Sequence, residues 1–338
     1  MKNEKVMMSH GSGGRLMHEM IRDVFFRNFD NEMLNRQTDA AVFPGGYDNY
    51  AFTTDSFVIH PVFFPGGDIG KLAVCGTVND LAVSGATPFY LSASFILEEG
   101  FDFGDLEKIV TSMSGEAKKA GVKIVTGDTK VVDKGKCDKI FINTTGIGAL
   151  DETNKHIGSG RNVETGDLIL INGSVGDHGI AVMSARNELN INVQLDSDCA
   201  SLNNMIASLL QKNIRVKFMR DPTRGGLATV LNELVHNKPF GIEMKESAVP
   251  VKENVLGMCE MLGFDPLYVA NEGKVVMVIH KEDAEKALEI LKQHEYGTES
   301  AIIGEIIPDH PGKAWLKTAV GGKRIIDMLS GEQLPRIC

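Results

Sequence analysis

The sequence predicts an α/β (α+β) protein of two domains, and three observations lead to this fold class. At 338 residues the chain is longer than a single small core usually holds. Its 43% hydrophobic and 24% charged residues, with 36 glycines, are the proportions of a globular α/β protein. Hydrophobic patterns typical of helices and of strands occur on both sides of a polar, glycine-bearing segment at 151–166, which we expect to separate the domains.

The first half is expected to be rich in strands. Residues 15–26 have the apolar spacing of an amphipathic N-terminal helix, and 39–60 are typical of a hairpin with a Pro-Gly-Gly turn. A buried helix should follow at 69–84, with Asp68 placed as its N-cap. The clearest helical pattern covers 105–121, whose final glycine should end the helix. Further strands are expected at 91–97, 122–127 and 139–150.

The second half alternates strands with helices. Strands are expected at 167–172, 216–219, 241–244, 274–280 and 301–307. Helices are expected at about 178–189, 200–213, 224–236, 252–262 and 282–293. From Gly321 the chain is punctuated by glycine, and we expect a mobile tail there. The predicted units are an N-terminal glycine-rich segment and helix, an N-terminal domain, a C-terminal α/β domain and the tail, with boundaries 1–37, 38–155, 156–320 and 321–338.

Charge and cysteine usage exclude several classes of protein. A formal net charge of −10 argues against binding to the phosphate backbone of nucleic acid. No apolar run approaches the roughly 20 residues of a membrane span, and the opening lacks the apolar core of a secretory signal. The cysteines are far apart and form no C-x-x-C pair, so we expect a reducing, cytoplasmic location. They are Cys75, Cys137, Cys199, Cys259 and Cys338.

Several aspartates lie where strands end or turns begin, and together they suggest a metal site. Each also has an ordinary explanation: Asp55 could be a solvated strand end, and Asp221 before Pro222 could cap a helix. Asp80 has apolar neighbours, which make an uncompensated carboxylate costly. The whole set is Asp39, Asp55, Asp80, Asp128 and Asp221. Carboxylates without His or Cys partners favour Mg²⁺, then Ca²⁺ or Mn²⁺, and Mg²⁺ usually shares substrate phosphates, which suggests a nucleotide.

Three glycine clusters could let backbone N–H groups approach such phosphates. They are "HGSGG" at 10–14, "PGGD" at 65–68 and "TRGG" at 223–226. Each one alone is better explained as a turn, and none is a Walker A loop. By spacing alone, Lys130 is a solvated strand lysine and Glu272 an ordinary loop glutamate.

Longer segments resemble a known family. "TTDSFVIHPVFFPGGDIGKLAVCGTVNDLAVSGATP", "AGVKIVTGDTKVV", "FINTTGIG", "RDPTRGGLATVLNE", "NEGK" and the terminal "PRIC" are together similar to the hydrogenase maturation factor HypE family. That family belongs to the ATP-using superfamily typified by aminoimidazole ribonucleotide synthetase and selenophosphate synthetase. The likeness runs from about His10 to Cys338.

The resemblance implies an activity and a set of residues. It implies a homodimer that binds ATP with Mg²⁺ near the dimer interface, and a C-terminal cysteine that a partner carbamoyltransferase carbamoylates. ATP-dependent dehydration would turn this thiocarbamate into a thiocyanate, whose cyano group passes to iron on a partner scaffold during [NiFe]-hydrogenase assembly. The implied catalytic residues are Cys338, Lys130 and Glu272, the implied metal ligands are Asp39, Asp55, Asp80 and Asp221, and the implied ATP-binding residues are Asp68, Asn79, Gly127, Asp128, Thr129, Gly225 and Gly226.

This interpretation gives the terminal cysteine a role. Extended, the 17 residues after Gly321 span about 60 Å, so Cys338 could leave the active site and visit another protein. Two departures from the superfamily pattern stand out. The "SHGSGGR" loop lacks the reactive Cys or selenocysteine and the Lys of selenophosphate synthetases, and "TDAAV" has one aspartate where many members have two.

Two other functions stay open. The chain could be another superfamily member that acts on a free small molecule, in which case deletion of the last residues would leave turnover intact. It could also be a non-enzymatic carrier that accepts a group on Cys338 and passes it on. ATP hydrolysis by the carbamoylated protein would separate the carrier from the enzyme.

Overall fold

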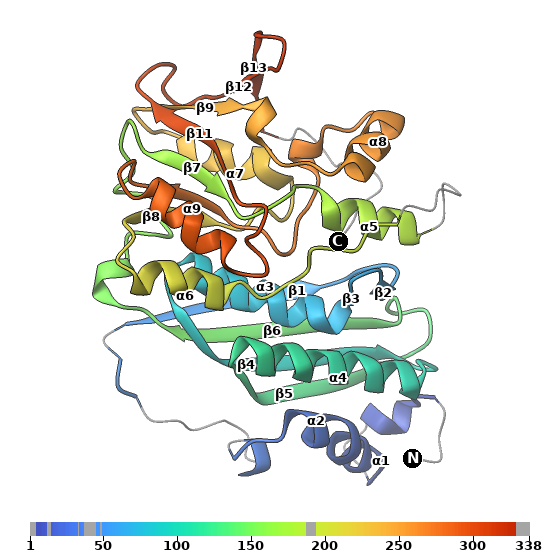
Figure 1. Cartoon of the computed structure of the whole chain (residues 1–338). Coiled ribbons are helices and arrows are strands. Elements are labelled where there is room, and N and C mark those ends of the chain that lie inside the picture. Colours follow the sequence, from blue (N-terminus) through green and yellow to red (C-terminus); the bar gives the residue numbers. More distant parts are fainter. Residues whose placement is uncertain are drawn as a thin grey trace.

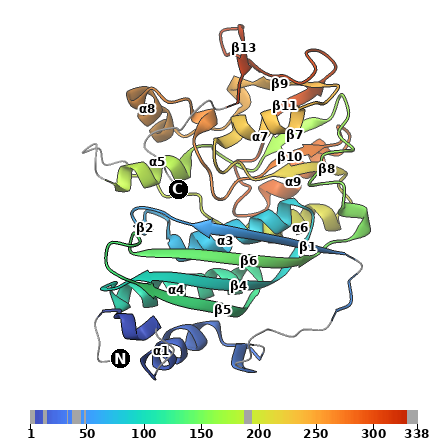
Figure 2. The same cartoon turned by 180° about the vertical axis from the view of Figure 1, so that it is seen from behind.

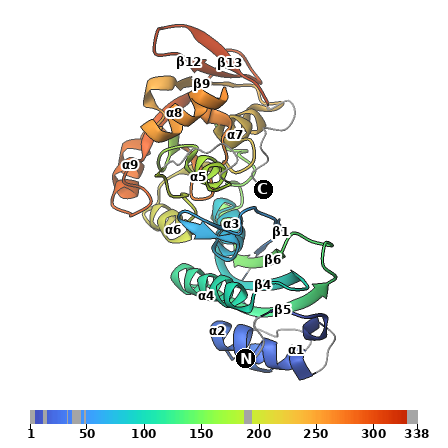
Figure 3. The ribbon, with the colours of Figure 1, turned by 90° about the vertical axis from the view of Figure 1, so that its right-hand side faces the viewer.

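The computed structural model consists of two halves stacked on each other, with helix α3 (Ile69–Val83) lying at the seam between them (Figures 1 and 3). The structure describes residues 5–11, 15–32, 34–36, 45–47, 49–186 and 194–328. Within these residues, no helix combines the length and the apolar character needed to cross a bilayer. The two-domain α/β prediction is confirmed.

The N-terminal half is built on a four-stranded sheet with the order β1-β6-β4-β5. These strands are β1 (Tyr50–Phe57), β6 (Ile140–Ala149), β4 (Thr87–Glu98) and β5 (Lys123–Val132). The β4–β5 pair is parallel and the other two are antiparallel. Buried and more exposed residues alternate along β1 and β6, because α3 and α4 (Phe103–Ala120) cover only one face of the sheet (Figure 2). The β1 residues that point to the other face are exposed in the part of the chain that the structure describes, and we call this the open face.

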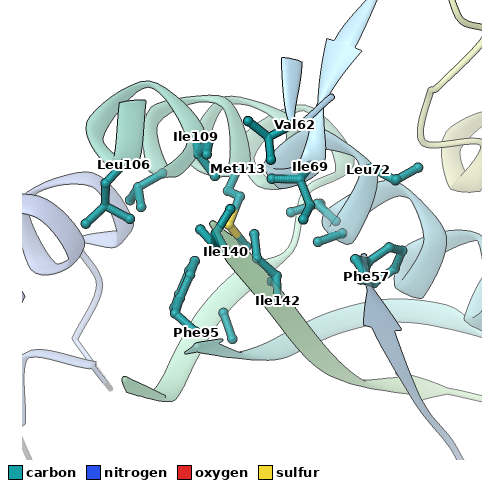
Figure 4. Close-up of a cluster of buried hydrophobic side chains, with 14 of the residues drawn as sticks. Phe57, Val62, Ile69, Leu72, Phe95, Leu106, Ile109, Met113, Ile140 and Ile142 are labelled. Carbon is teal, nitrogen blue, oxygen red and sulfur yellow. The ribbon is translucent and has the colours of Figure 1, made fainter. Parts of the chain in front are cut away.

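Helix α3 begins where the sequence predicts, and α4 ends at the predicted glycine but begins two residues earlier than expected, at Phe103 after the N-cap Asp102. The Asp68 carboxylate accepts hydrogen bonds from the N–H groups of Gly70 and Lys71 and so caps α3, while Gly121 closes α4 with φ of 74°. Their apolar faces meet the sheet in a core (Figure 4). Residues drawn there include Ile69 and Leu72 of α3, Leu106, Ile109 and Met113 of α4, and Phe95, Ile140 and Ile142 of the sheet.

The N-terminal helix is confirmed but is not a regular α-helix. It consists of α1 (Arg15–Met20), a π-helical turn (Ile21–Phe26) and α2 (Arg27–Phe29), and it packs near α4 and β5. The hairpin expected at 39–60 is described only in part. Its second run is β1, which pairs with β6, and its first run lies outside the described residues. A small two-stranded sheet, β2 (Phe63–Phe64) with β3 (Gly67–Asp68), precedes α3.

The C-terminal half contains a seven-stranded sheet with the order β13-β12-β9-β11-β7-β10-β8, in which only the β12–β9 pair is parallel. Its strands are β7 (Leu168–Ile171), β8 (Val216–Arg220), β9 (Gly241–Lys245), β10 (Val276–Ile279), β11 (Ala301–Ile307), β12 (Ala314–Lys317) and β13 (Lys323–Ile326). Helix α7 (Gly226–Val235) shares one hydrophobic cluster with this sheet. The helices α6 (Asn203–Gln211) and α9 (Ala284–Lys292) share another, which also includes Ala82 and Val83 of α3.

The remaining helices are short or lie beside the sheet. Helices α5 (Asp177–Ala185) and α8 (Glu253–Leu262) pack together in a cluster of their own. Single 3₁₀ turns cover Met8–Gly11, Leu34–Arg36, Glu152–Asn154, Glu246–Ala248 and Pro266–Tyr268. The helices and strands predicted for this half are therefore all present, with ends that differ by a few residues.

The start of the predicted tail is corrected by the structure. Strands β12 and β13 form a hairpin at the edge of the large sheet, and the boundary expected at Gly321 falls inside its turn. Gly321 has φ of 88°, and its N–H donates to the Thr318 carbonyl, so the glycine serves a turn instead of ending the domain. Pairing of Lys323–Ile326 with β12 fixes these residues in the sheet.

One segment of the C-terminal half, residues 198–204, joins the two halves. Its Ser201 donates from N–H and Oγ to the Glu116 carboxylate of α4, and the Asn203 amide donates to the Ala120 carbonyl at 2.8 Å. Asn79 of α3 donates to the Ala200 carbonyl at 2.9 Å. These bonds and the shared cluster around Val83 fix the seam that holds the site.

Candidate active site

Four carboxyl groups from four different elements converge at the seam. Asp55 comes from β1, Asp80 from the last turns of α3, Asp221 from the end of β8, and Glu272 from the loop before β10. The charge of Asp80 acts on Asp221, and the charges of Asp221 and Asp55 act on Glu272. We call these four residues the acidic cluster. Neither domain contains it alone, because the first two residues belong to one half and the last two to the other.

The environment of the acidic cluster disfavours ionisation. Burial raises the pKa of Asp221 to about 7, and repulsion from Asp80 contributes to the rise. Burial also raises the pKa of Asp55 and of Asp80, and it raises that of Glu272 well above its ordinary value, with Asp221 as the next cause. A site in which several carboxyl pKa values are displaced upward by burial and by each other is typical of a functional site.

Few protein groups offset this negative charge. Nη2 of Arg224 lies 3.9 Å from Oδ1 of Asp55, and the Thr53 hydroxyl donates to Oδ2 of Asp80 at 2.8 Å. Arg220 is attracted to Asp80 but makes its own ion pair with Glu233 at 2.7 Å. The carboxyl groups therefore fit a bound cation, whose charge would lower their pKa values again.

The donor set also limits which cation fits. Among the described residues, no three His, Cys, Asp or Glu side chains are close enough to hold a metal ion by themselves. A hard ion that takes one or two carboxylates and completes its shell with water and phosphate oxygens, as Mg²⁺ does, suits this arrangement. A closed structural metal site does not.

The two glycines at the start of α7 allow a close approach of this turn to the backbone of residues 267–269, in the segment that leads to Glu272. Gly225 and Gly226 have φ of 72° and 60°, and a Cβ on Gly226 would lie 2.6 Å from the Leu267 carbonyl oxygen. The helix begins at Gly226, so the alternative that Asp221 caps this helix is wrong. Asp221 lies instead on the strand side of the turn, directly after β8, and α7 begins on the other side of the same turn.

The loop that carries Glu272 is surrounded by polar groups. The Glu272 N–H donates to Oδ1 of Asp198 at 3.0 Å, and Nζ of Lys274 lies 3.0 Å from Oδ2 of Asp198. A cavity of about 380 Å³ borders this loop and is lined by Asp198, Gly273 and Lys274 among others. Glu272 itself is buried, with 8% of its surface exposed, so a group that reaches it must be excluded from bulk water.

The end of the described chain lies beside the same loop. The Tyr268 hydroxyl donates to the Asp327 carbonyl at 2.9 Å, and Arg324 of β13 forms an ion pair with Asp265. Tyr268 is four positions before Glu272 along the chain. The segment 265–272 therefore connects the root of the C-terminal residues to the acidic cluster.

The predicted residues of β5 are not in this cluster. Asp128 of β5 pairs with Ser94 of β4. In the same row across the sheet, Ser94 pairs with Asn143 of β6, and Asn143 pairs with Ser56 of β1. Three strand spacings of about 4.8 Å thus separate Asp128 from the edge strand that carries Asp55. Lys130 lies opposite the exposed Ile96 on the open face of the sheet and forms an ion pair with Asp128 at 2.8 Å.

The neighbours of Asp128 have local roles. Thr129 is buried, and a Cβ on Gly127 would lie 2.2 Å from the Ala93 carbonyl oxygen, so this glycine permits the close β4–β5 pairing. Asp68 caps α3, and the Asn79 amide bonds across the seam. Asp39 and Cys338 lie outside the described residues.

Sequence reasoning missed three residues around the acidic cluster. Thr53 supports Asp80, Arg224 faces Asp55, and Asp198 holds the Glu272 backbone. Thr53 and Arg224 stand inside the quoted "TTDSF" and "RDPTRGG" segments, so their position beside two candidate aspartates was a usable signal. No pattern in the sequence connects Asp198 to Glu272.

Comparisons with known proteins agree with this architecture. Residues 37–150 match the model of the N-terminal domain, and residues 164–317 that of the C-terminal domain, of AIR synthase related proteins. Carbamoyl dehydratase HypE of Azotobacter vinelandii is 48% identical over 338 residues, covering 100% of this chain and 98% of that protein.

Two solved structures are also similar. Hydrogenase maturation protein HypE in complex with ATP has a TM-score of 0.93 and 48% identity, covering 98% of this chain and 99% of that one. A chain of the HypE–HypF complex has a TM-score of 0.79 and 51% identity, covering 94% and 100%.

Proposed function

We propose that this chain, which belongs to the carbamoyl dehydratase HypE family, uses ATP to dehydrate an S-carbamoyl group on its own Cys338 to a thiocyanate. The observation that carries the proposal is the acidic cluster at the seam, in which the buried Glu272 lies among carboxylates suited to a nucleotide-bound cation. A relative in this family has been solved with ATP bound.

The proposed chemistry has two steps. The carbamoyl oxygen attacks the γ-phosphorus of ATP as an N–H proton leaves, which gives an S-linked imidate phosphate and ADP. The second N–H proton then leaves as the C–O bond breaks, which gives S–C≡N and inorganic phosphate. We assign the role of base to Glu272. Burial and Asp221 raise its pKa, and the charge of a bound cation would oppose this rise and leave the carboxylate ionised to accept the proton.

Asp39, Asp55, Asp80 and Asp221 are the candidate Mg²⁺ ligands, and of the three described ones no more than two would bind the ion directly, with the third acting through water. The ion would offset the charge of the phosphate oxygens during transfer. Gly225 and Gly226 let the backbone at the start of α7 come close to the same phosphates. The Gly225 N–H would donate to a phosphate oxygen, whereas the Gly226 N–H donates to the Thr223 carbonyl at 3.1 Å. The predicted nucleotide contacts of Asp68, Gly127, Asp128 and Thr129 remain part of the proposal.

The position of the chain end supports delivery of Cys338 to this site. The chain is anchored at Asp327 beside the loop that leads to Glu272. From Met328 the ten remaining residues can span at most about 35 Å, which is enough to reach the cluster and also to extend beyond the protein.

A second copy of the chain would complete the site. The open face of the N-terminal sheet carries exposed aromatic residues, with Phe52 69% and Tyr50 42% exposed, and such a patch is typical of a protein interface. Asp128 and Lys130 lie on this face, and we propose that association of two chains through it brings them to the partner's cluster. In this proposal Lys130 acts at the site of the opposite protomer.

The partners follow from the same chemistry. A carbamoyltransferase loads Cys338, in keeping with the solved HypE–HypF complex, and an iron-carrying scaffold accepts the cyano group. No nucleic acid or membrane partner is proposed, and the working location is the cytoplasm.

The direct test is mass spectrometry of the Cys338 peptide. Incubation with the carbamoyltransferase, carbamoyl phosphate and ATP should add about 43 Da, and dehydration should then remove about 18 Da. Cys338→Ala should abolish both changes while ATP binding persists. Modification of Cys75, Cys137, Cys199 or Cys259 instead would refute the proposal, and so would ATP binding without loss of the 18 Da.

A further inference from the structure

The peptide groups on either side of the Glu272 Cα atom are held by side chains from both halves. The Glu272 N–H donates to Oδ1 of Asp198 at 3.0 Å. Its carbonyl accepts from Nδ2 of Asn79 at 3.4 Å and from the Ala200 N–H at 3.5 Å. A Cβ on Gly273 would lie 1.8 Å from the Asp198 carbonyl oxygen, so only glycine allows the loop to approach this closely. The backbone of Glu272 therefore has little freedom.

From this geometry we propose that Asn79 and Asp198 are positioning residues that fix Glu272 relative to Asp80. The inference rests on the proposed function, in which Glu272 is the base. Asn79 precedes Asp80 on α3, so the helix that carries a nucleotide-site carboxylate also holds the peptide that carries the base. The hydrogen bond from Asn79 to the Glu272 carbonyl would thus align the base with the nucleotide directly, without relying on packing elsewhere between the two halves.

The hydrogen bonds of the Asn79 side-chain amide fix its orientation. Its amide also donates to the Ala200 carbonyl at 2.9 Å and accepts from the Leu202 N–H at 2.8 Å, and the residue is only 2% exposed. Both amide hydrogens are used, so the side chain cannot turn toward another partner without leaving buried groups unpaired, at about 1–3 kcal/mol each.

Asp198 is fixed as well. Nζ of Lys274 lies 3.0 Å from Oδ2 of Asp198. Both side chains are largely buried, with 3% of the Asp198 side chain and 10% of the Lys274 side chain exposed. Removal of one member of such a pair leaves an uncompensated buried charge and endangers folding. The test therefore uses Asn79, which is neutral.

The experiment compares Asn79→Ala with Asn203→Ala in the full-length, S-carbamoylated protein. Asn203 lies in the same 198–204 segment and also donates one buried hydrogen bond across the seam, to the Ala120 carbonyl, but it has no bond to Glu272. Both variants should lose similar thermal stability. The rate of thiocyanate formation at saturating ATP should fall about tenfold or more in Asn79→Ala only, since small misplacements of reacting groups cost this much.

A double-mutant cycle separates positioning from a structural effect. If Asn79 acts through Glu272, Asn79→Ala should add little to the loss already caused by Glu272→Gln. A full additional loss would overturn the inference, and so would a rise in the ATP concentration for half-maximal rate with an unchanged maximal rate. If Asn79→Ala does not fold, Asn79→Ser, which is too short to reach the Glu272 carbonyl, takes its place.

The outcomes distinguish the inference from the function on which it rests. Wild-type protein that forms no thiocyanate would refute the proposed function. Wild-type protein that forms it, with Glu272→Gln inactive and Asn79→Ala as fast as wild type, would refute only the positioning roles of Asn79 and Asp198.

Discussion

The hydroxyl of Thr53 donates a hydrogen bond to Oδ2 of Asp80 at 2.8 Å, from the edge strand of the small sheet to the helix at the seam. Successive residues of a strand point to opposite faces, so Thr53 and Asp55 face α3 while Phe52 and Thr54 face away. One strand thus supplies a carboxylate to the site, supports a second carboxylate, and presents its other face for association.

The Thr53–Asp80 bond should contribute to nucleotide affinity. Thr53→Val keeps the shape but removes the donor, so we expect about tenfold weaker ATP binding in the presence of Mg²⁺, the cost of a hydrogen bond to a charged group. Asp80→Asn should weaken binding more, and Thr53→Ser should restore it. Isothermal titration calorimetry measures all three, and unchanged affinity in Asp80→Asn would remove that residue from the site.

The raised pKa of Asp221 predicts a pH-dependent loss of stability in the free protein. The pKa of this carboxyl is about 7 in the folded chain against 3.8 ordinarily, so the folded state binds the proton more tightly. As pH rises from about 4 to 7 the unfolded state ionises first and the free energy of unfolding falls; above pH 7 the loss is constant.

Asp221→Asn removes this titration. The difference in thermal midpoint between Asp221→Asn and wild type, without nucleotide or Mg²⁺, should grow by a few degrees across that window in favour of the variant. The exposed Asp133, changed to Asn, is the control and should show no such trend. A difference that is flat with pH would contradict the assignment of a desolvated carboxyl that Asp80 repels.

The open sheet face should be the dimer interface. Phe52→Asp places a charge in that face and should give a monomer by light scattering, with loss of dehydration because each site lacks the partner's Lys130. Met261→Asp on α8 is matched in exposure, 65% against 69%, and should stay dimeric. A dimeric Phe52→Asp protein would move the interface elsewhere.

Glu272→Gln should leave Cys338 carbamoylated and ATP bound while thiocyanate formation slows by about a hundredfold or more, since proton transfer by a positioned base contributes this much. Glu295→Gln is the control, because Glu295 lines the neighbouring cavity but is 60% exposed. Normal conversion by Glu272→Gln would exclude Glu272 as the base.

If Lys130 acts on the opposite protomer, the two inactive variants should complement each other. In a mixed dimer of Lys130→Ala and Glu272→Gln chains, one site carries both defects and the other carries none. Co-expression should therefore restore thiocyanate formation that neither homodimer shows. A mixed dimer as inactive as its parents would mean that both residues serve one chain's site.

Much of this molecule follows from local sequence. The helix from Ile69 begins where the Asp68 side chain can accept from its first N–H groups, and α4 ends at a glycine that can adopt positive φ. Such caps and periodic patterns depend on neighbours within a few positions, so the sequence alone predicts them. The hydrophobic pattern also predicts the strand ends and turns at which the candidate aspartates lie.

Only the tertiary structure decided which of these groups meet. The β12–β13 hairpin depends on an open sheet edge supplied by β9, and a local pattern cannot reveal such a partner. Likewise Asp55, Asp80, Asp221 and Glu272 gather because the halves stack along α3, whereas strand pairing places Asp128 and Lys130 across the sheet. The bond from Glu272 to Asp198 spans 74 positions, and proximity over that separation is set by packing of the whole chain, not by residue type.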